Sequence, residues 1–250
     1  MNAYFCVCIA ALLAYAAGIL HVGVLSRVPR TRLVQFVYAF TIVALYLYCV
    51  SRIYGGVGLD DWNFRNALPT ANVSPFSFFC CLFFPFLPRA SRRVLGGTFA
   101  LLSFGMLTAA VLTGVYNILR NYTLHDTYVC DIAAHLVLSL FGVYLVQSGQ
   151  VRLRVRDLVP GGLYIVVIAL AMLVLNAVFG TAYFGLSFAG RHNIYGVVLP
   201  NAYLSAAVYL TGLVGVLCVG GFFQRFLCRH VFARQKRGAS APLLIESSLV

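Results

Sequence analysis

The chain has 250 residues, of which 62% are hydrophobic and only 10% are charged, and its mean hydropathy is +0.91. A soluble domain carries about 25% charged residues, so this composition excludes a water-soluble fold and predicts a single membrane-embedded domain. The net charge of +12 comes from arginines between apolar stretches, which favours contact with anionic lipid headgroups over binding of nucleic acid.

Seven apolar stretches have the length of membrane-spanning helices, which need roughly 20 predominantly apolar residues. In chain order they cover residues 3–25, 33–54, 68–88, 94–119, 128–150, 158–180 and 200–224. The first stretch lacks a basic segment before it and is followed by arginines, which predicts an uncleaved helix and not a signal peptide. We therefore expect an all-α membrane protein, with one seven-helix domain over residues 1–237 and a flexible cytoplasmic tail over residues 238–250.

The basic residues between these stretches predict the orientation, because short cytoplasmic loops are enriched in arginine and lysine. If all seven stretches cross, 14 of the 18 basic residues lie on one side of the membrane. The third stretch is interrupted by Pro75, Pro85 and Pro88, but if it turned back, only five basic residues would lie inside. The sequence thus predicts seven crossings with the N-terminus outside and the C-terminus inside.

Ionisable residues inside membrane helices are costly, and each is therefore a functional hypothesis. Asp131 and His135 are four residues apart in the fifth stretch, on one face of the expected helix. A carboxylate in that position can accept the imidazole N–H, fix the tautomer and raise the basicity of the other ring nitrogen. In a nucleophilic triad a carboxylate orients a histidine and the histidine acts as the base, so this pair could supply two of the three residues.

A cysteine could complete such a triad. Cys80 and His135 each lie seven residues inside the outer end of an apolar segment, or roughly 10 Å deep at 1.5 Å per residue. Asn176 lies roughly 6 Å below the outer end of the sixth stretch on the same scale. These residues, with Cys80 or Cys81 as the thiol, are expected in one outer-leaflet layer.

Two other interpretations of the pair stay open. Asp131 and His135 could form a structural polar lock between helices, with the cysteines as packing. They could also form a proton relay in a small proton- or ion-coupled transporter. No inverted repeat is detectable, so a transporter of this size would be expected to act as a homo-oligomer. A seven-helix receptor is a weaker alternative, because the cytoplasmic loops are short.

The segment from Asp131 to Gly221 resembles the YwaF-like family of bacterial integral-membrane proteins. It has a helix with His135, a basic loop, an apolar helix that ends LNAVFGTAY, and Pro200 before the last helix. The family has an Asn before a Gly-Thr-Asn-Tyr run, matched here by Asn176 and Gly180 to Tyr183, although Ala182 replaces the second Asn. The family is similar to a eukaryotic multi-pass acyltransferase that acts on ether phospholipids.

The resemblance implies an acyltransferase in a bacterial cytoplasmic membrane that acts on membrane lipids from the outer leaflet. A Cys on the third helix and a His on the fifth are the catalytic pair proposed for such proteins, which corresponds to Cys80 and His135. Asp131 would orient His135, and Asn176, Tyr183 and Cys81 would bind substrate. The run before Cys80, Val-Ser-Pro-Phe-Ser-Phe-Phe, lacks the His of the family, and the Cys comes one place later.

Membrane lipids are the expected partners, and neither a cofactor nor a metal is predicted. The eight cysteines include no CxxC pair, so zinc and redox motifs are not indicated.

Overall fold

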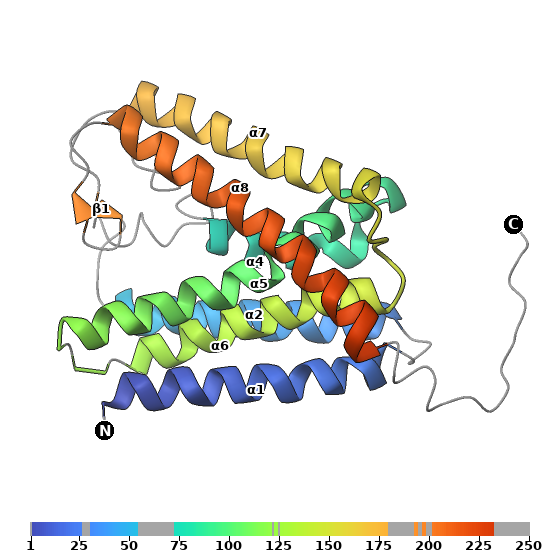
Figure 1. Ribbon diagram of the computed structural model, residues 1–250, viewed down its shortest axis with the longest axis horizontal. Helices are drawn as coiled ribbons and strands as arrows, with labels where there is room; N and C mark the ends of the chain where they lie inside the picture. Colours follow the sequence, from blue (N-terminus) through green and yellow to red (C-terminus); the bar gives the residue numbers. More distant parts are fainter. Residues whose placement is uncertain are drawn as a thin grey trace, which may run out of the picture.

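The computed structural model describes residues 2–26, 31–54, 73–121, 123–124, 126–179, 193–194, 197–198 and 202–232. These residues are almost entirely helical (Figure 1). The helices are α1 (Ala3–Leu25), α2 (Thr31–Tyr54), α4 (Val73–Phe83), the 3₁₀ turn η1 (Phe84–Phe86), α5 (Arg89–Leu119), α6 (Asp126–Gln147), α7 (Val155–Phe179), α8 (Ala202–Phe226) and the π-helical turn η3 (Leu227–Phe232). Two antiparallel two-residue strands, β1 (Asn193–Ile194) and β2 (Val197–Val198), precede α8.

Six of the described helical segments are long and apolar enough to cross a membrane. They correspond to α1, α2, α5, α6, α7 and α8 continued into η3. Six of the seven predicted stretches are therefore confirmed as apolar helices of spanning length, and the architecture is that of a multi-pass membrane protein. The third predicted stretch forms the shorter segment α4–η1.

Segment α4–η1 is short because prolines interrupt its backbone hydrogen bonds. Pro85 has no N–H to donate, and the chain there tightens from α4 into η1. Leu87 is extended, with ψ 148°, as expected for a residue before proline. The segment nevertheless runs antiparallel to α2, because the ring of Phe78 lies 5.4 Å from that of Tyr46 and the ring of Phe86 lies 5.1 Å from that of Phe36.

Helices α5 and α6 form the centre of the bundle. Helix α6 packs against α1, α2 and α5, and α5 packs against α7 and α8. In Figure 1, α1 therefore lies on one side of this centre and the pair α7 and α8 on the other. Many large apolar side chains on the outward faces of α1, α2, α7 and α8 are exposed, as expected where lipid tails cover a helix.

Glycines allow α7 and α8 to approach α5 closely. A Cβ on Gly161 of α7 would lie 2.6 Å from the backbone nitrogen of Thr98, and a Cβ on Gly220 of α8 would lie 1.8 Å from the carbonyl oxygen of Leu101. The Thr98 hydroxyl also donates to the carbonyl oxygen of Gly161, at 3.1 Å. Small residues and a hydroxyl hydrogen bond are the usual means of joining helices in lipid.

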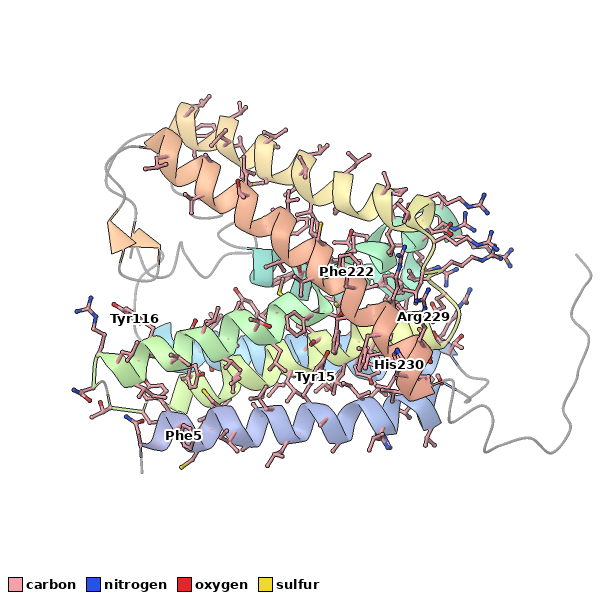
Figure 2. All side chains as sticks on the ribbon, in the orientation of Figure 1. Phe5, Tyr15, Tyr116, Phe222, Arg229 and His230 are labelled. Carbon is pink, nitrogen blue, oxygen red and sulfur yellow. The ribbon has the colours of Figure 1, made fainter. Side chains whose placement is uncertain are left out.

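Arginines gather at one end of the bundle, where α5 and α7 begin and where α8 ends. Figure 2 shows their nitrogen atoms beyond the helix ends on this side, with Arg229 labelled nearby. The arginines of these three helix ends are Arg89, Arg92, Arg93, Arg154, Arg156, Arg225 and Arg229. The predicted tail over residues 238–250 lies outside the described residues.

Candidate functional site

Asp131 and His135 form a contact within α6. The His135 Nδ1 lies 3.4 Å from an Asp131 carboxylate oxygen and 2.8 Å from the Asp131 backbone carbonyl oxygen. A backbone carbonyl oxygen and the oxygen of an ionised carboxylate are both acceptors and cannot donate a hydrogen bond. Nδ1 is therefore the protonated nitrogen, and Nε2 is the nitrogen that can take up a further proton.

The two side chains of the pair differ in exposure. The His135 side chain is 9% exposed, whereas the Asp131 side chain is 46% exposed. The edge of the His135 ring meets Phe78 of α4, with the ring centres 5.4 Å apart, and Phe78 in turn contacts Tyr46 of α2. The imidazole is thus held in an aromatic environment between three helices, and the carboxylate lies nearer the surface.

Two cysteines that the sequence did not place at the site lie beside Asp131. Cys49 of α2 has Cys130 of α6 as a hydrogen-bond partner and is close enough to Asp131 for their charges to interact. These two cysteines are 81 positions apart, so their contact could be found only from the pairing of α2 with α6.

Cys80 lies on the other side of α4. It is a hydrogen-bond partner of Tyr164 of α7, and the ring of Phe76, one turn earlier, lies 6.4 Å from the ring of the same tyrosine in a tilted arrangement. At 100° per residue, Cys80 is about 200° around the helix from Phe78. The structure thus places Cys80 and His135 against opposite faces of α4.

Cys81 lies nearer to the His135 side of α4. It is about 60° around the helix from Phe78, and its side chain is fully buried in the core. Of the two adjacent cysteines, Cys81 is therefore the one on the α6 side. Asn176, on the last turns of α7, is buried, and Tyr183 lies outside the described residues.

A small pocket borders Cys80 between α4, α5 and α7, and its cavity volume of about 10 Å³ is room for about one water. Cys80, Tyr164, Ser77 and Thr98 are among the residues around it, but the surface that faces the pocket is apolar. The lining residues are Phe76, Ser77, Cys80, Leu95, Thr98, Phe99, Leu102, Tyr164, Ile165 and Ile168. Such walls suit a hydrocarbon chain better than a charged headgroup.

Further buried polar side chains join helices in the interior. The Ser139 hydroxyl of α6 donates to Tyr15 of α1 at 3.0 Å, and the Gln224 amide of α8 donates to the Ser103 hydroxyl of α5 at 2.6 Å. The amide oxygen of Gln224 is buried and has no partner among the described residues. The sequence analysis missed Gln224 because it ends an apolar stretch.

No group of three or more His, Cys, Asp or Glu side chains in the described part of the chain could hold a metal ion. Comparison with protein-family models, with curated proteins and with solved structures finds no match to the chain.

Proposed function

We propose that the protein crosses the membrane seven times, with the N-terminus outside, and that the Asp131–His135 pair is the proton-binding site of a small proton- or ion-coupled transporter. Three observations support the topology. Six helices have spanning length, α4–η1 runs antiparallel to α2, and the arginines gather at one end of the bundle (Figure 2). The positive-inside rule assigns that end to the cytoplasm.

The geometry of the pair carries the proposal. With His135 neutral, the pair has one negative charge, and a proton on Nε2 makes it a neutral ion pair whose partners lie 3.4 Å apart. A charge inside the membrane is costly unless it is paired. The pair therefore has a physical reason to take up one proton.

Polar side chains continue from the pair toward the arginine end. Ser139 is one turn further along α6 than His135 and contacts Tyr15, and Gln224 contacts Ser103 near the end of α8. The buried oxygen of Gln224, which has no partner within the described part of the chain, is the type of group that a buried water satisfies. Hydroxyls and such waters can pass protons between them, and an amide can hold them in place by hydrogen bonds.

We expect Asp131→Asn to reduce proton flux at least tenfold, because the neutral amide cannot pair with a protonated His135. The purified protein would be placed in liposomes that contain a pH-sensitive dye, and the internal pH would be followed after an external acid pulse. Asp157→Asn, which neutralises a carboxylate in the first turn of α7 at the arginine end, is the matched control and should keep the wild-type rate. Equal rates for wild type and Asp131→Asn would rule out the proposal.

Acyl transfer at the Cys80 pocket is a second candidate function, favoured by a thiol beside largely apolar walls and by the sequence resemblance to acyltransferases. The Cys80 sulfur would attack a phospholipid acyl ester, the ester C–O bond would break, and the thiol proton would pass to the departing lysolipid oxygen. A second alcohol would then take the acyl group from the thioester and return its proton to Cys80. Tyr164 is the described neighbour that positions the thiol.

An alkyne-tagged acyl phospholipid tests this second function. We expect a hydroxylamine-sensitive label on the protein that is lost in Cys80→Ser, weakened in Tyr164→Phe and retained in Cys218→Ser, a control that changes an exposed cysteine of α8. Labelling that persists in Cys80→Ser would exclude a Cys80 thioester.

A further inference from the structure

We infer that Cys49 and Cys130 form a dithiol that closes to a disulfide and joins α2 to α6 beside Asp131. Neither cysteine belongs to a sequence motif, and the pairing exists only because the two helices pack together. The inference uses the proposed orientation in one respect, since that orientation places the dithiol near the outer surface.

The register of α2 and α6 places these two side chains opposite each other. The ring of Tyr38 lies 5.4 Å from that of Phe141. Cys49 is 11 residues after Tyr38, and Cys130 is 11 residues before Phe141. Eleven residues are about three helical turns, so in two antiparallel helices both cysteines return to the faces that already touch at Tyr38 and Phe141.

Two further observations agree with this register. Tyr46, one turn before Cys49, and His135, just over one turn after Cys130, both contact the Phe78 ring at 5.4 Å. The two thiols are also hydrogen-bond partners of each other. The register and this interaction thus make the two thiols neighbours across the α2–α6 interface, which is the arrangement that a disulfide needs.

The exposure of the two thiols gives the order of the reaction. Cys49 is 6% exposed, and Cys130 is partly exposed. A small disulfide, or the disulfide of an oxidoreductase, would be attacked by the Cys130 thiolate, which releases one thiolate and leaves a mixed disulfide. The Cys49 thiolate would then attack the Cys130 sulfur and release the second thiolate, and the two thiol protons would end on the two released groups.

The location of the dithiol suggests what it regulates. Cys130 directly precedes Asp131 in α6, so a disulfide would hold α2 against the helix that carries the proton-binding pair. Extracytoplasmic compartments are oxidising, whereas the cytoplasm keeps thiols reduced. The Cys49–Cys130 dithiol is thus a redox-controlled link between α2 and α6 beside the proposed proton site.

Counting the thiols that can be alkylated tests the inference. Membranes that contain the protein would be treated with diamide, an azo compound that accepts two electrons and two protons, then denatured, alkylated and measured by intact mass. The wild type should lose two of its eight alkylatable thiols, and tandem mass spectrometry should identify a Cys49–Cys130 peptide. Cys49→Ser and Cys130→Ser should each lose none, and Cys218→Ser should still lose two.

Full alkylation of both cysteines in the oxidised wild type would overturn the inference, and so would a loss of two thiols that persists in Cys49→Ser. A reporter fused to the C-terminus shows on which side of the membrane that terminus lies, and so tests the proposed orientation independently of the disulfide. A Cys49–Cys130 disulfide together with an external reporter would refute the proposed orientation while it would uphold the dithiol.

Discussion

Replacing Gly220 by alanine will separate α8 from α5 and unfold the bundle at a much lower temperature than the wild type. The added Cβ would lie 1.8 Å from the Leu101 carbonyl oxygen and 2.8 Å from its carbonyl carbon. Both atoms belong to the backbone of a long helix, so neither can rotate away, and overpacking of this kind costs about 3 kcal/mol. The Gln224–Ser103 hydrogen bond, one turn further along α8, should be lost with the same contact.

Gly215→Ala is the matched control for this substitution. Gly215 is on the same helix, but a Cβ there would meet nothing within 4 Å. Alanine favours a helix over glycine by about 1 kcal/mol, so this variant should unfold at or above the wild-type temperature. Thermal unfolding of detergent-solubilised protein, followed by size-exclusion chromatography, measures both. Equal unfolding temperatures for the two variants would contradict the close α5–α8 crossing.

The extent of the helices could be predicted because hydropathy is a local property of the sequence. The first predicted stretch, residues 3–25, matches α1 at both ends, and the seventh differs from α8 by two residues at each end. The third stretch was less predictable. Its prolines indicated an interruption, but they did not show that α4 would be followed by a separate 3₁₀ turn, η1, from Phe84.

The candidate site was predictable only where it lies within one helix. The Asp131–His135 contact follows from a spacing of four residues, and the structure has it at 3.4 Å. Whether Cys80 faces His135 depends on how α4 is rotated about its own axis, and an estimate of depth in the membrane gives no information on that rotation. Packing turns Phe78 toward His135 and Cys80 toward Tyr164, and the role of each residue in catalysis stays a prediction.

The contact between Cys49 and Cys130 could not be predicted for a related reason. It requires the register of α2 against α6, and that register follows from aromatic packing such as Tyr38 on Phe141 and Tyr144. An apolar helix offers many faces of similar hydropathy to its neighbours. The shapes of particular side chains therefore decide which face of the helix packs inward. The composition of the helix alone does not predict that face.

The aromatic cluster around Phe141 should contribute more to stability than any lipid-facing side chain. The Phe141 ring is fully buried and lies 5.4 Å from Tyr38 of α2, 5.5 Å from Phe84 of η1 and 5.5 Å from Phe99 of α5. Phe141→Ala removes all three contacts and leaves a cavity between four segments. Such a loss costs about 3–5 kcal/mol.

Phe40→Ala provides the comparison for Phe141→Ala, because it removes the same side chain from the outward face of α2, where Phe40 is 74% exposed. Its effect on unfolding should stay within about 0.5 kcal/mol. The two variants would be compared by chemical denaturation in the same detergent. Because Phe84 of η1 contacts Phe141, the Phe141→Ala protein should also be cut faster by protease near Pro85, whereas Phe40→Ala should not. Equal cleavage of the two variants would mean that the third segment is held in the bundle by contacts other than this cluster.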